Sequence, residues 1–119
     1  MKIRKICFDI DGVICKLTKD NNYKKSKPIK KNIRLINNLF QKNIYIILFT
    51  SRYMGRNNDN QIKAKKMGYK FTEKQLKKWG LKYNKLLMGK PSYDLIIDDK
   101  SIFFNKNWQS SLLEKIKKK

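Results

Sequence analysis

Four of the nine acidic residues in this 119-residue chain stand in two close pairs, each directly after an apolar run. One pair is Asp9 and Asp11, and the other is Asp98 and Asp99. Neighbouring carboxylates repel each other and raise each other's pKa unless a positive charge holds them. The two pairs therefore predict a hard divalent cation, and with it chemistry on a phosphate group.

Other catalytic types are excluded by composition. The chain has no histidine, which rules out Ser-His-Asp and Cys-His catalysis and leaves proton transfer to carboxylates. Its cysteines, Cys7 and Cys15, form neither a zinc-type Cys-x-x-Cys pair nor a disulfide framework. We expect reduced thiols and a cytoplasmic protein, with no membrane insertion, because no signal peptide or apolar run of about 18 residues is present.

The chain is strongly basic. Lysines and arginines number 30, giving a net charge of +21 that would attract nucleic acid, an anionic membrane or a phosphorylated substrate. The lysines are scattered over the whole chain and alanine occurs once, which is typical of an AT-rich genome. We favour this compositional interpretation and leave nucleic acid open as a partner.

Alternating apolar and amphipathic segments predict the elements that position the acidic pairs. A strand, a helix and a second strand in succession form a βαβ unit with a parallel sheet. The expected elements are a strand at 3–8, an exposed flap at 13–27, a helix from Pro28 to about Asn43, a strand at 44–49, a helix ending at Gly68, a short helix from a Thr72 capping box to Gly80, strands at 86–88 and 94–97, and a closing helix through Trp108, Leu112 and Ile116.

The carboxyl ends of parallel strands meet at one edge of a sheet, where ligands bind. The pattern therefore brings Asp9, Asp11 and Thr50 together with the Asp98-Asp99 pair. A chain of this length has room for one domain with one modest core, which we place at residues 1–119.

Four motifs in order resemble those of the haloacid dehalogenase superfamily of phosphohydrolases. They are Phe8-Asp9-Ile10-Asp11-Gly12-Val13, Phe49-Thr50-Ser51-Arg52, Lys90-Pro91 and Ile97-Asp98-Asp99, and they span residues 6–99. The resemblance implies an α/β fold with a Rossmann-like core, in which helices flank a small, mostly parallel sheet. The intervals between motifs are filled by the expected elements, so the protein resembles the small capless members.

The resemblance also implies the catalytic roles. Asp9 is the nucleophile that forms an aspartyl-phosphate, and Asp11 protonates the departing oxygen and then activates water. Gly12 permits the tight turn between them. Thr50 and the Ser51 backbone bind the phosphate oxygens.

Lys90 neutralises the charge on the transferring group. Mg²⁺ is held by Asp9, the Asp11 carbonyl and the last acidic pair. Within that pair we assign Asp99 as the direct ligand, with Asp98 beside it, although the two roles are exchangeable.

One part of the sequence departs from the superfamily pattern. Only Pro91, Ser92 and Tyr93 separate Lys90 from the expected strand at 94–97. A parallel crossover needs about a dozen residues. Either 86–88 is not a parallel neighbour of that strand, or the sheet is trimmed here.

The expected function is a Mg²⁺-dependent phosphomonoesterase. The chain is similar to small bacterial phosphatases of sugar-phosphate and surface-polysaccharide biosynthesis, so we favour a phosphorylated sugar or polyol, with Arg52 and Arg56 contacting it. Without a cap, a neighbouring subunit of a homo-oligomer is a candidate lid. The alternatives are a phosphatase acting on 3′-phosphorylated nucleic-acid ends and a non-catalytic, basic nucleic-acid-binding module.

Overall fold

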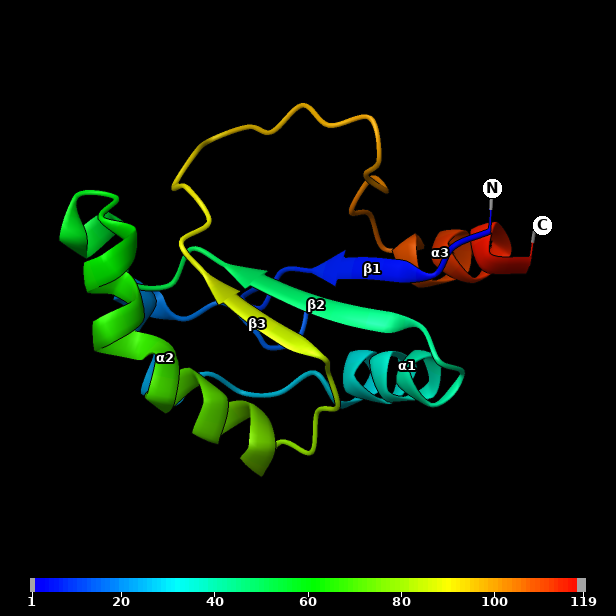
Figure 1. Cartoon of the computed structure of the whole chain (residues 1–119), viewed down its shortest axis with the longest axis horizontal. Helices are drawn as coiled ribbons and strands as arrows, with labels where there is room; N and C mark the ends of the chain where they lie inside the picture. Colours follow the sequence, from blue (N-terminus) through cyan, green and yellow to red (C-terminus); the bar gives the residue numbers. More distant parts are fainter. Residues whose placement is uncertain (1, 118–119) are drawn as a thin grey trace.

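Three short apolar runs form a parallel sheet in the computed structural model, which describes residues 2–117 (Figure 1). The strand order is β1-β2-β3, with Phe8 paired to Leu48 and Leu48 to Leu86. The elements are β1 (Lys5–Phe8), η1 (Lys19–Asn21), η2 (Tyr23–Lys25), α1 (Lys30–Gln41), β2 (Tyr45–Thr50), η3 (Gly55–Asn57), α2 (Gln61–Lys78), β3 (Lys85–Met88) and α3 (Trp108–Lys117). The protein is thus a small α/β domain, and no cap is evident among the described residues.

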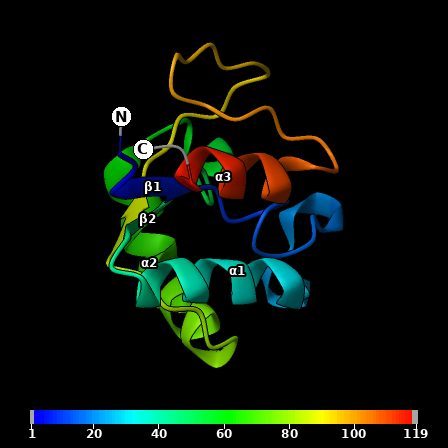
Figure 2. The same cartoon turned by 90° about the vertical axis from the view of Figure 1, so that its right-hand side faces the viewer.

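The helices lie on one side of the sheet (Figure 2). Side chains alternate between the faces of a strand, and Ile46, Leu48 and Leu86 are buried beneath α1 and α2. Residues of the opposite face, such as Tyr45 and Leu87, stay exposed. Parallel sheets are ordinarily covered on both faces, so this sheet is incompletely buried.

The helix predicted from Pro28 forms as α1, and its spacing explains why. Ile33, Ile36 and Leu39 recur every three or four residues and are all buried in the core. The closing helix is also confirmed as α3, with Trp108 packed edge-on against Phe8 at a centroid distance of 6.5 Å.

The prediction of two helices between Ile62 and Gly80 is wrong, because α2 is continuous from Gln61 to Lys78. Gly68 and Thr72 were interpreted as a helix end and an N-cap. Both lie instead on the buried stripe of α2, at the four-residue spacing that one uninterrupted helix requires. Gly68 is small because the ring of Tyr53 packs directly on its Cα, where a Cβ would overlap it.

The prediction of a strand at 94–97 is also wrong for this structure. Residues 91–101 contain no strand and are exposed, with Leu95 at 81% and Ile97 at 95% (Figure 1). The link from β3 is too short for a parallel crossover, so the sheet is trimmed to three strands. Each large aliphatic side chain left in water forgoes about 1.5–3 kcal/mol.

Within residues 2–117, no helix combines the length and the apolar character needed to span a membrane.

Gly68→Ala tests the contact between α2 and Tyr53. The added methyl group must displace the Tyr53 ring, so we expect a loss of about 1–3 kcal/mol in unfolding free energy, measured by urea denaturation. Gly55→Ala is the control, because a Cβ at Gly55 meets no atom within 4 Å. Equal stability of the two variants would contradict the packing described.

Candidate active site

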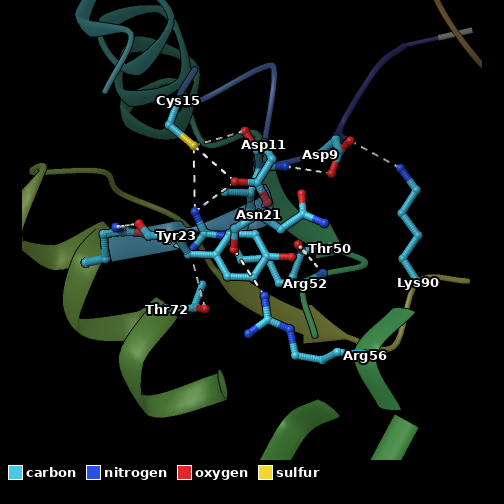
Figure 3. Close-up of polar contacts among 12 residues, drawn as sticks. Asp9, Asp11, Cys15, Asn21, Tyr23, Thr50, Arg52, Arg56, Thr72 and Lys90 are labelled. Atoms are coloured by element: carbon cyan, nitrogen blue, oxygen red, sulfur yellow. Dashed lines mark hydrogen bonds and ion pairs between the residues drawn. The ribbon is translucent and has the colours of Figure 1, made fainter. Parts of the chain in front are cut away.

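The carboxyl ends of the strands bring Asp9, Thr50 and Lys90 together, as expected (Figure 3). Asp9 directly follows β1, and Lys90 follows β3 after one glycine. The backbone N–H of Lys90 donates to the Thr50 carbonyl at 3.1 Å, which ties the loop after β3 to the end of β2. The Lys90 ammonium then lies 3.6 Å from Oδ2 of Asp9.

Asp9 is held where its charge is poorly compensated. Burial raises the pKa of its carboxyl; the Lys90 charge and the hydrogen bond from the Ile10 backbone N–H lower it in part, and the Asp11 charge raises it further. Burial lowers the pKa of Lys90, but its contacts with Tyr93 and Asp9 outweigh this and leave that pKa raised. The net result is a half-buried carboxylate with a raised pKa beside a charged lysine.

Asp11 forms a two-point ion pair with Arg52. Nε of Arg52 donates to Oδ2 at 2.9 Å and Nη2 donates to Oδ1 at 2.9 Å. Gly12 allows the chain to turn immediately after Asp11, with φ at +92° and its N–H bonded to the Cys15 carbonyl at 2.7 Å. This geometry fixes Asp11 more tightly than Asp9.

The structure overturns the expectation that Arg52 contacts a substrate, because its side chain is completely buried. Nη1 donates to Gln75 Oε1 at 2.7 Å, and the Tyr23 ring stacks on the guanidinium at 4.6 Å (Figure 3). Burial lowers the pKa of Arg52, but the contacts with Asp11 outweigh it and raise that pKa. Arg52 instead joins the end of β2 to the first motif, to α2 and to the flap at 13–27.

Cys15 belongs to the same network. Its thiol donates to Oδ1 of Asp11 at 3.4 Å, and Nη2 of Arg52 lies 3.7 Å from its sulfur. Burial, followed by the Asp11 charge, raises the pKa of this thiol to about 12. Cys15 therefore stays protonated at neutral pH and is no nucleophile.

A polar pocket of about 640 Å³ opens beside Asp9 and Asp11. Ser51 and Arg56 line it, whereas the Thr50 hydroxyl is buried and accepts the Arg52 backbone N–H at 3.1 Å. The flap, the loop after β2 and the loop after β3 supply the rest of the wall, which comprises Leu17, Asp20, Asn21, Tyr23, Tyr53, Gly55 and Ser92.

Arg56 is the arginine that lines the pocket. It is exposed, stacks on the rings of Tyr53 at 4.8 Å and Tyr23 at 5.3 Å, and donates to the Asn21 carbonyl at 3.1 Å.

The structure does not bring Asp98 and Asp99 to this edge. Both lie in the exposed loop after β3, where Asp98 accepts the Lys100 backbone N–H. No group of three His, Cys, Asp or Glu side chains that could hold a metal occurs within residues 2–117. The predicted Mg²⁺ site is therefore incomplete within the described residues, since Asp98 and Asp99 lie away from Asp9 and the Asp11 carboxylate is paired with Arg52.

Three side chains of the site escaped sequence reasoning, namely Tyr23, Thr72 and Gln75. Thr72 and Gln75 were interpreted as a capping box, yet the same three-residue spacing places both on the α2 face that holds Arg52. Tyr23 is the only aromatic residue in the flap at 13–27. An aromatic residue in an otherwise polar flap is the signal that could have identified it.

Arg52→Ala tests the ion-pair network. The change leaves Asp11 partly buried without its partner, so we expect a loss of about 3–5 kcal/mol in unfolding free energy. Urea denaturation measures it, with Arg56→Ala as the exposed control expected to change stability little. Equal losses in the two variants would contradict the role given to Arg52.

Asp9→Asn tests the electrostatic strain at Asp9. Since the native pKa is raised, the folded state binds this proton more tightly and wild-type stability falls as pH rises through that pKa. We expect the variant to be more stable than wild type at pH 7, and the difference to vanish below about pH 3.9, the ordinary aspartate value. Urea denaturation across pH measures this, with exposed Glu114→Gln expected to follow wild type. A variant less stable at pH 7 would contradict it.

Comparison with known proteins supports the fold. No family model and no curated protein matches the sequence. The crystal structure of a target protein from Vibrio cholerae superposes with a TM-score of 0.77, covering 97% of this chain and 98% of that one, at 24% sequence identity. At this identity the likeness establishes a shared α/β fold and nothing about function.

Proposed function

We propose that the protein is a phosphomonoesterase of the haloacid dehalogenase type, built on that superfamily's Rossmann-like core. The observation that carries the proposal is Asp9, a half-buried carboxylate that directly follows β1, opens on a polar pocket and has Lys90 3.6 Å away. Its raised pKa shows that this placement costs stability. Perturbed carboxylates in a pocket are typical of catalytic groups.

In the first step a carboxylate oxygen of Asp9 attacks phosphorus. The new O–P bond forms as the ester O–P bond breaks, and the product is an aspartyl-phosphate. Lys90 balances the negative charge that the phosphoryl group brings against Asp9. Ser51 lines the pocket and would bind the phosphate oxygens, while the Thr50 hydroxyl holds the backbone N–H of Arg52 beside it.

Asp11 handles the protons. Its carboxyl group gives a proton to the departing oxygen and takes one back from the water that cleaves the aspartyl-phosphate. A guanidinium favours the ionised form of a carboxyl group. The ion pair with Arg52 therefore suits Asp11 as the base that activates water. To protonate the departing oxygen, Asp11 must first separate from Arg52.

The proposed substrate is a phosphorylated sugar or polyol. The pocket volume of about 640 Å³ suits a small ligand, and its wall offers aromatic rings and polar groups. Arg56 is the exposed cation available to a substrate hydroxyl or carboxylate. Cys7 and Cys15 are both free thiols, which supports a reducing, cytoplasmic location as part of the proposal.

The proposal predicts phosphate release from an aryl phosphate and from sugar phosphates in the presence of Mg²⁺. Asp9→Asn should lower kcat about a thousandfold or more, and Lys90→Met roughly a hundredfold, because each removes a group that acts in the transition state. Asp11→Asn should slow sugar phosphates more than the aryl phosphate, whose leaving group needs no proton. Phosphate release assays measure all three.

The matched control is Lys85→Met, an exposed charge on β3 that should keep full activity. An Asp9→Asn variant with wild-type activity would overturn the mechanism. A substrate panel that includes a 3′-phosphorylated oligonucleotide separates the substrate classes, since faster turnover of the oligonucleotide would replace the sugar-phosphate assignment.

A further inference from the structure

Within residues 2–117, the segment 94–99 pairs with no strand. Its sequence is Asp-Leu-Ile-Ile-Asp-Asp, which is strongly β-forming at its centre, yet Leu95, Ile96 and Ile97 are 81%, 54% and 95% exposed. The segment also carries a third of the chain's nine acidic residues and no basic one. Exposed apolar side chains gathered in one segment are typical of a surface that contacts another chain.

The sheet has an unpaired strand edge at β1. Among the described residues β1 pairs only with β2, so its outer edge presents unpaired N–H and C=O groups (Figure 1). Such an edge is a template for another strand. The body of the chain is highly basic, and the segment at 94–99 has the opposite charge.

The segment 94–99 cannot pair as a parallel strand with the β1 edge of its own chain. Residues 89–93 are all that separates Met88 from Asp94, whereas a parallel crossover needs about a dozen. A connection too short to close on its own chain is the condition under which protomers exchange an element.

We infer that two copies exchange the segment 94–99, each adding it as a parallel fourth strand to the outer edge of the partner's β1. The parallel direction, though not the exchange itself, rests on the proposed function. In this direction Asp98 and Asp99 end beside the Asp9 of the other copy. The second copy then supplies the carboxylates that one copy lacks, and the joint set of oxygen ligands fits Mg²⁺.

The first experiment measures mass in solution by light scattering coupled to size exclusion. We expect wild type at about twice 14.3 kDa, and the double variant Leu95→Asp/Ile97→Asp as a monomer. Both replaced side chains are exposed in one copy, so the fold should survive, which far-UV circular dichroism checks. Ile62→Asp, 80% exposed on α2, is the matched control and should stay dimeric. A monomeric wild type overturns the inference.

The second experiment lengthens the link. About ten Gly/Ser residues inserted between Ser92 and Tyr93 allow the segment to reach the β1 edge of its own chain. We expect a monomer that retains phosphatase activity. A dimer unaffected by the insertion would mean that the copies associate through another surface, and would overturn the exchange.

The third experiment asks whether the site is shared. Asp9→Asn and Asp98→Asn/Asp99→Asn are each expected to be inactive alone. When the two variants are coexpressed, half of the dimers are mixed and each of these has one complete site, so about a quarter of wild-type activity should return. No recovery, from variants whose mixed dimers are isolated by two affinity tags, overturns the shared site. An inactive wild type would instead refute the proposed function and leave the mass measurement to decide the exchange.

Discussion

The ion pair between Arg52 and Asp11 is the interaction on which the site depends. Removing a guanidinium from water costs several kcal/mol, and a single carboxylate rarely compensates for it. Arg52 is tolerated in the core because Asp11, Gln75 and the face of Tyr23 all contact it. These partners come from the first motif, from α2 and from the flap. Arg52 therefore ties these three segments to one another.

Asp9 is in the opposite situation. Its cationic partner, Lys90, is 3.6 Å away, and burial leaves the pKa of Asp9 raised. A carboxylate that lowers stability at neutral pH is explained by chemistry better than by architecture, since sites of function often sacrifice stability. Two acidic residues separated by one position thus have different surroundings: Asp11 is anchored by Arg52, and Asp9, the proposed nucleophile, opens on the pocket.

Much of this was predictable because it depends on local patterns. Continuous apolar runs identified β1 and β2, and apolar residues recurring every three or four positions identified α1 and α3. The same logic correctly placed Asp9 and Thr50 at one edge, since parallel strands end together, but it wrongly placed Asp98 and Asp99 there. Local signals failed at Gly68, where a glycine was interpreted as a helix end although it makes room for the Tyr53 ring. Such a contact joins residues from different elements, and no spacing along the chain encodes it.

The sequence by itself determined the chemistry available to the protein: two acidic pairs after apolar runs, a lysine just past the third strand and no histidine. Only the tertiary structure decided how these groups are used. Arg52 pairs with Asp11 and does not face a substrate, because a buried guanidinium needs hydrogen-bond partners within the core. The tertiary structure also left 94–99 in solvent, because the reach of a short connection depends on where the strands lie in space, and local pattern carries no such distance.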